Sequence, residues 1–184
     1  MLEKLRSFLL QRLIRRALAA LNRQRKVHTL DSARTIGLLF DASDEKDRKD
    51  VLALAKSLKE GRRKSVHLLG FIDDKQPLVQ TEFPQFSQKE LRWNGQIVSE
   101  SVDKFLAEKP DLLLCLNRRQ TLPLAWVAVE SKATMKIGTA ATAPHDFDMV
   151  LETPEDKGIR FFMDQLELYL TKIIPSKHES ASAL

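Results

Sequence analysis

Two adjacent arginines, Arg118 and Arg119, are the residues of this chain best suited to binding a small anion. They follow Asn117 at the end of an apolar run, and two neighbouring guanidinium groups can hold a phosphate or carboxylate through paired hydrogen bonds. If the apolar runs form one parallel sheet, their carboxyl ends meet at one edge, where open α/β sheets bind ligands. The expected crevice is lined by Asp41, Ser43, Asn117, Arg118, Arg119, Thr139 and Thr142. The alternative is that both arginines lie on a solvated loop.

The sequence contains few other groups suited to catalysis or cofactor binding. Its six glycines are scattered, and the first apolar run lacks the glycine-rich loop of dinucleotide and nucleoside triphosphate sites. Neither paired cysteines nor a His-Glu-x-x-His motif is present, so zinc chemistry is not indicated. The segment His145-Asp146-Phe147-Asp148 could ligate a metal, but a polar loop before a strand predicts the same residues. We therefore predict no catalytic residue, no metal and no cofactor, and we favour a non-enzymatic protein.

The elements that would position these residues alternate along residues 35–174. Short apolar runs alternate with helical patterns, as in parallel sheets covered by helices on both faces. We expect strands at 35–40, 65–72, 111–116, 135–138 and 147–151, and helices at 44–61, 99–108, 122–131 and from Pro154 to about residue 174. The long connection 73–98 has room for an edge strand around 78–83. The fold class is therefore a single doubly wound α/β domain of about five mostly parallel strands, Rossmann-like or flavodoxin-like.

Most of the positive charge lies in the first 26 residues. They hold eight Lys and Arg against one Glu, a net charge of +7, whereas the whole chain carries +5, so the remainder carries −2. On a helical projection most leucines fall on one half and most basic residues on the other, with Leu5 and Phe8 towards the basic side. The basic residues are Lys4, Arg6, Arg12, Arg15, Arg16, Arg23, Arg25 and Lys26. We expect a basic amphipathic helix over 1–26, a linker over 27–34, the α/β domain over 35–174 and a disordered tail over 175–184.

Three interpretations of this helix are left open by the sequence. Its apolar face can pack on the protein's own domain and leave the arginines in solvent. It can lie in a membrane surface with its leucines in lipid, or it can neutralise RNA phosphates. Its apolar stretches are only three or four residues long, so we expect no transmembrane segment there.

Two resemblances to known families accompany the expected strands. The first is carried by Ile36-Gly37-Leu38-Leu39-Phe40-Asp41, Leu69-Gly70-Phe71-Ile72-Asp73, Leu91-Arg92-Trp93-Asn94-Gly95, Pro110-Asp111-Leu112-Leu113, Ser131-Lys132-Ala133 and Lys136-Ile137-Gly138. Over most of the chain it resembles a family of uncharacterised proteins from Bacteroidota, which implies no activity but supports these boundaries and a bacterial cytoplasm. The run 111–116, a helix and Lys136-Ile137-Gly138 also resemble the acceptor half of heptosyltransferase-like glycosyltransferases, whose nucleotide-sugar half is absent here. That likeness implies shared Rossmann-like geometry only.

The function predicted from the sequence is docking. We expect a non-enzymatic accessory protein whose basic helix binds an anionic partner, with RNA or the ribosome favoured over a membrane surface. The sequence also leaves a protein partner open. A membrane-peripheral scaffold is the first alternative, and a small-anion-binding or glycosyltransferase-like domain is the second. The single cysteine, Cys115, falls in an expected central strand, so we interpret it as a buried apolar residue. The expected location is the cytoplasm, or its periphery at the inner membrane.

Overall fold

A six-stranded parallel sheet forms the centre of the computed structural model, which describes residues 2–73, 82–142, 144–154 and 156–173. Its order is β3-β2-β1-β4-β5-β6, and every neighbouring pair is parallel. The strands are β1 (Thr35–Asp41), β2 (Ser65–Ile72), β3 (Gln85–Ser87), β4 (Leu112–Cys115), β5 (Met135–Thr139) and β6 (Met149–Leu151). The predicted α/β class is confirmed, with one strand more than expected. The additional edge strand is β3, and residues 78–81 of the expected edge strand lie outside the described residues.

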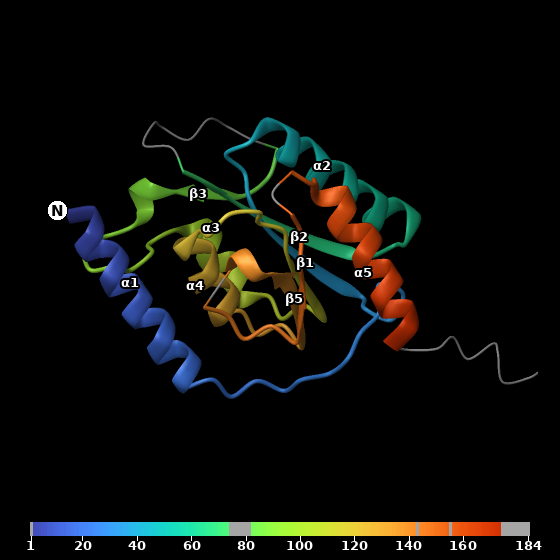
Figure 1. Ribbon diagram of the computed structural model, residues 1–184, viewed down its shortest axis with the longest axis horizontal. Coiled ribbons are helices and arrows are strands. Elements are labelled where there is room, and N and C mark those ends of the chain that lie inside the picture. Colours follow the sequence, from blue (N-terminus) through green and yellow to red (C-terminus); the bar gives the residue numbers. More distant parts are fainter. Residues whose placement is uncertain (1, 74–81, 143, 155, 174–184) are drawn as a thin grey trace, which may run out of the picture.

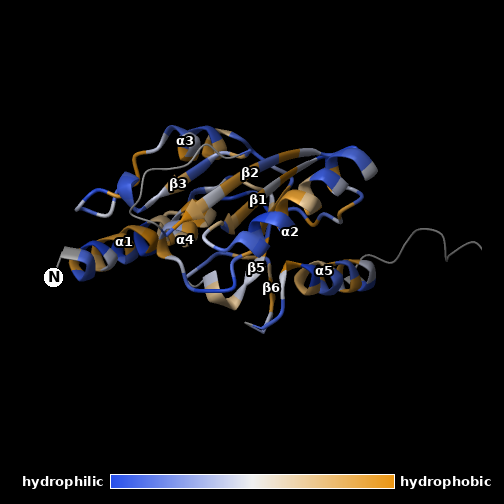
Figure 2. Cartoon of the chain, turned by 90° about the horizontal axis from the view of Figure 1, so that it is seen from above, coloured by the Kyte–Doolittle hydropathy of each residue, from blue (hydrophilic) through white to orange (hydrophobic). Residues whose placement is uncertain are grey.

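Helices cover both faces of this sheet, as Figure 1 shows. They are α1 (Leu2–Ala19), α2 (Glu45–Lys56), α3 (Glu100–Ala107), α4 (Leu122–Glu130) and α5 (Ile159–Ile173). Short helical turns follow at Ser57–Gly61, Gln88–Glu90 and Ala140–Thr142. Helices α2 and α5 pack on one face, whereas α3 and α4 pack on the other, with α1 lying against α4. In Figure 2, α1 and α5 each combine hydrophobic and hydrophilic residues, as helices that bury only one side do.

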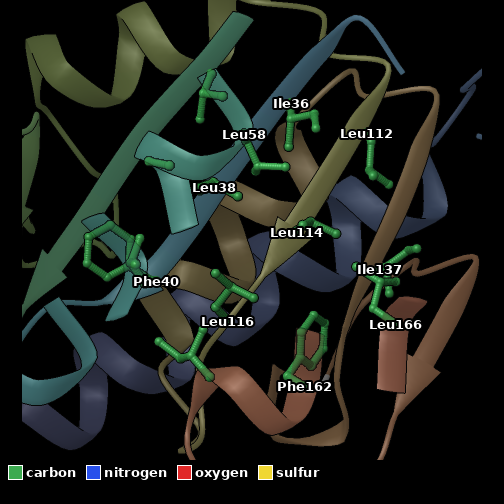
Figure 3. Close-up of a cluster of buried hydrophobic side chains, with 14 of the residues drawn as sticks. Ile36, Leu38, Phe40, Leu58, Leu112, Leu114, Leu116, Ile137, Phe162 and Leu166 are labelled. Atoms are coloured by element: carbon green, nitrogen blue, oxygen red, sulfur yellow. The ribbon is translucent and has the colours of Figure 1, made fainter. Parts of the chain in front are cut away.

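The strands are apolar throughout because both faces are buried. In β1, Ile36, Leu38 and Phe40 point into the core under α2 and α5, where Phe162 also packs (Figure 3). The intervening Leu39 belongs to the second core, under α1, α3 and α4. An unbroken apolar run is therefore what this sheet requires of its central strands.

Two helix boundaries differ from the prediction. Helix α5 begins at Ile159 rather than at Pro154, because the backbone N–H of Lys157 donates to the carbonyl of Pro154 (2.9 Å) and closes a turn first. Helix α1 ends at Ala19 rather than at residue 26. The chain beyond it runs back along the domain, where the N–H of Lys26 donates to the carbonyl of Thr134 (3.1 Å).

The segment expected as a linker, residues 27–34, is part of the folded domain. Leu30 and Ala33 are buried in the core under α2 and α5, at 4% and 0% exposure. His28 is buried as well. The expected tail, residues 175–184, lies outside the described residues. The N-terminal helix is therefore joined to the sheet by a packed strap over residues 20–34.

Candidate functional site

At the carboxyl edge of the sheet, the residues predicted to line a crevice form separate groups of hydrogen bonds. Asn117 follows β4, and its Nδ2 donates to Thr142 Oγ1 (2.9 Å), while Thr139 Oγ1 donates to the Asn117 carbonyl (2.6 Å). All three are buried. After β1, the N–H of Ser43 donates to Asp41 Oδ1 (2.9 Å), and Ser43 Oγ accepts from the N–H of Asp73 (2.9 Å). These contacts tie the strand ends together.

The two arginines of the crevice do not converge on one point. Arg118 donates from Nε (3.1 Å) and Nη2 (2.8 Å) to Oδ2 of Asp47, a buried residue of α2. This hydrogen bond raises the pKa of Arg118, with the nearby negative charge acting in the same direction. Arg119 is exposed. Because Arg118 is neutralised by Asp47, the paired-arginine anion clamp expected from the sequence is not formed.

The other groups considered for chemistry have structural surroundings. Cys115 is fully buried, and burial raises the pKa of its thiol, so it is held as a thiol. His145 stacks on Phe147 with ring centroids 4.4 Å apart, and burial lowers the pKa of His145. No group of three or more His, Cys, Asp or Glu in the described part of the chain is arranged to hold a metal ion.

Helix α1 buries one side and exposes the other. Leu10 and Ile14 are 2% and 0% exposed and pack in the core with α3 and α4. Gly95 has φ +84°, and a Cβ there would lie 2.8 Å from the Leu10 backbone nitrogen, so the turn at Asn94-Gly95 rests directly on the helix. The interpretation that this helix packs on its own domain is therefore correct.

The outward side of α1, which we call the outer stripe, is basic and partly apolar. It consists of Lys4, Leu5, Phe8, Arg12, Arg15 and Arg16, all of which are exposed. Leu5 and Phe8 keep 47% and 61% of their surface exposed. At 100° per residue both lie among the four basic side chains, opposite Leu10 and Ile14. One helix therefore presents apolar side chains on both sides, and only the inner side is covered.

The remaining basic residues of the N-terminal segment differ in availability. Arg6 lies on the flank of α1, and its Nη2 donates to Gln88 Oε1 (2.8 Å). Arg25 pairs with Asp148 (3.2 Å), and Lys26 is exposed. Arg23 is not available to a partner, because its side chain is 5% exposed and pairs with Asp146 (3.2 Å) and Asp148 (3.0 Å).

Arg23 belongs to a buried ionic network that the sequence analysis missed. Lys136 in β5 is 0% exposed, and its Nζ donates to both carboxylate oxygens of Asp146 (3.0 and 2.9 Å) and to the Val129 carbonyl (3.0 Å). Burial lowers the pKa of Lys136, and Asp146 opposes that effect. The acids assigned to a polar loop thus hold β5 and the strap. The sequence does carry a signal for this network. Lys136 lies inside an apolar strand, and Asp146 and Asp148 follow it ten and twelve residues later.

The chain belongs to a family of unknown function, DUF6913, which matches residues 6–173. The match spans the whole sheet and most of α1, and it confirms the resemblance to an uncharacterised family. Neither a curated protein nor a solved structure matches the chain. None of the described helices is long and apolar enough to cross a bilayer.

Proposed function

We propose that this protein is a non-enzymatic docking protein that binds an anionic membrane surface through the outer stripe of α1. The observation that carries the proposal is the exposure of Leu5 and Phe8 among four cationic side chains. Anionic lipid headgroups attract Lys and Arg, and the region just beneath them accepts apolar side chains. The proposed location is the cytoplasmic surface of the inner membrane.

RNA is the partner favoured from the sequence, but it would use only part of the outer stripe. Phosphates would satisfy Lys4, Arg12, Arg15 and Arg16, and Phe8 could stack on a base. Leu5 would gain little, because an aliphatic side chain beside a solvated phosphate backbone stays in water. Lipid binding uses the cationic and the apolar residues together, and for that reason we favour it.

The rigidity of α1 fits shallow insertion. Since Leu10 and Ile14 are in the core, the helix need not fold on binding, and the ordering cost of a disordered anchor is avoided. Completing the burial of two half-exposed apolar side chains contributes about 2–3 kcal/mol. Each basic residue near an anionic leaflet contributes about 1 kcal/mol. These figures predict reversible, salt-sensitive attachment.

The test is flotation of the full chain with two kinds of vesicle. One contains phosphatidylcholine alone, and the other also contains about 30 mol% of the anionic lipid phosphatidylglycerol. Leu5→Gln with Phe8→Gln should weaken binding to the anionic vesicles about 30-fold or more. The matched control is Leu168→Gln with Tyr169→Gln on α5, whose side chains are exposed to a similar degree, 45% and 44%. This control pair should leave binding unchanged.

A pair of charge variants tests the cationic residues, and RNA binding measured on all the variants distinguishes lipid from RNA. Arg12→Gln with Arg15→Gln should weaken vesicle binding, whereas Lys56→Gln with Lys59→Gln, two exposed lysines at the end of α2 and just after it, should not. Fluorescence anisotropy with single-stranded RNA is measured on the same variants. If the Leu5 and Phe8 variant binds vesicles like the wild type, and the arginine variant loses RNA binding instead, the membrane proposal is wrong and the RNA interpretation replaces it.

A further inference from the structure

A cavity of about 570 Å³ lies beneath the N-terminal half of α1, away from the outer stripe. Its wall includes Asp73 just after β2, Gln88 just after β3, and Leu122 at the start of α4, which follows β4. It therefore opens at the carboxyl edge of the sheet, where α/β proteins bind small ligands. Its volume lies within the range of small-molecule sites.

A row of hydrogen bonds crosses the polar side of this cavity. Arg6 Nη2 donates to Gln88 Oε1 (2.8 Å), and Gln88 Nε2 donates to Asp73 Oδ1 (2.7 Å). The amide thus separates a guanidinium from a carboxylate. In the part of the chain that the structure describes, Nε and Nη1 of Arg6 and Oδ2 of Asp73 make no further hydrogen bond. Because these atoms have no further hydrogen-bond partner among the described residues, they can bind a ligand.

The charged residues that line the cavity define the chemistry that fits, and Glu3, three residues before Arg6 on α1, adds a second carboxylate to this lining. Arg6 presents N–H groups suited to a planar carboxylate, and Asp73 presents an acceptor suited to an ammonium group. Gln88 already bridges the two with its oxygen towards Arg6 and its nitrogen towards Asp73. An α-amino acid carries an acceptor and a donor in the same order, with its carboxylate next to its ammonium group.

Four apolar residues also line the cavity, although polar atoms form most of its exposed surface. Leu122 is partly exposed, whereas Leu10, Leu91 and Pro123 are buried and present little surface to a ligand. An apolar ligand side chain would lie against Leu122, while the charged groups of the ligand would face Arg6 and Asp73. We propose that this cavity is a binding site for a free α-amino acid with an apolar side chain.

The proposal is independent of membrane docking, since no residue of the outer stripe lines the cavity. Because Arg6 and Leu10 belong to α1 whereas Asp73 and Gln88 follow strands, a bound amino acid would link the helix to the sheet. Occupancy should therefore stabilise the attachment of α1, since a ligand that binds only the folded state stabilises it.

The experiment is thermal unfolding of the full chain with L-leucine at about ten times its dissociation constant, which should raise Tm by about 3 °C. Two analogues divide the charges: 4-methylpentanoate lacks the ammonium group, and 3-methylbutylamine lacks the carboxylate. Both should bind at least about 10-fold more weakly in calorimetric titrations. Arg6→Gln should abolish the leucine response, whereas Arg12→Gln on the outer stripe should keep it.

Ser7→Phe provides a second variant, because it fills the cavity from an exposed helix position without removing a member of the hydrogen-bonded row. It should fold and lose leucine binding. The proposal is overturned if leucine, methionine and phenylalanine all leave the wild-type Tm unchanged at about 10 mM. It is also overturned if 4-methylpentanoate binds as tightly as leucine, or if Ser7→Phe retains binding.

Discussion

The buried network around Lys136 predicts that removing the charge of Asp146 lowers the free energy of unfolding more than removing the charge of Lys136. Asp146→Asn preserves shape but leaves the Lys136 ammonium, which is 0% exposed, with no carboxylate. Removing one partner of a buried pair costs about 3–5 kcal/mol. Lys136→Met removes the other charge, yet Asp146 keeps Arg23 Nε at 3.2 Å. That variant should therefore lie within about 1.5 kcal/mol of the wild type.

Urea unfolding at pH 7.5 measures this asymmetry, with m-values checked for constancy. The expected free energy of unfolding is lower for Asp146→Asn than for Lys136→Met by about 2 kcal/mol or more. Equal losses in the two variants would mean that the pair acts as one stabilising unit. A loss below about 1 kcal/mol for Asp146→Asn would mean that Lys136 is not charged in the folded protein. Either result would refute the reasoning.

The same lysine predicts the sign of a pH effect. Burial lowers the pKa of Lys136 in the folded protein from its ordinary value of 10.5. At a pH between the folded-state pKa and 10.5, the unfolded chain binds more protons at this lysine than the folded chain does. The free energy of unfolding therefore rises with pH in that window. The wild type should therefore gain stability relative to Lys136→Met as pH is raised towards 10.5, measured by urea unfolding across that window.

Two glycines supply the remaining predictions. Gly138→Ala should destabilise the domain by about 1–3 kcal/mol, because its Cβ would clash with the Phe147 ring. Pairing it with Phe147→Leu should restore part of the loss. Gly95→Ala should loosen α1, because the position has φ +84° and its Cβ would clash with the Leu10 backbone. Hydrogen exchange should then rise in α1 more than in β1, and equal protection of α1 in both proteins would contradict this.

Local signals identified most of the elements correctly. The cap residue Asp44 accepts from the N–H groups of Lys46 (2.8 Å) and Asp47 (3.1 Å), and the helical pattern after it ends at Gly61 as expected. Local signals predicted the wrong helix boundary where the backbone made another contact in place of a helical hydrogen bond. Pro154 is acceptable at a helix start, but a turn precedes α5, and the strap beyond Ala19 trades helical hydrogen bonds for contacts with the domain.

The crevice shows why residues at one sheet edge need not form a site. Placing Asn117, Thr139 and Thr142 together needed only the register of a parallel sheet, and the structure does place them together. The partner of Arg118 could not be inferred, because Asp47 is 71 residues away in the chain. Whether a guanidinium is free or neutralised depends on such long-range contacts.

By itself, the sequence determined the α/β class, the continuous apolar strands and the charge contrast between the N-terminal segment and the rest, since these follow from residue type and local spacing. Only the tertiary structure decided how the charges are used. It left Lys4, Arg12, Arg15 and Arg16 in solvent but closed Arg23 onto Asp146 and Asp148. The physical reason is that a charged side chain is equally compatible with water and with a buried counter-charge, and only the folded chain determines which of them surrounds it.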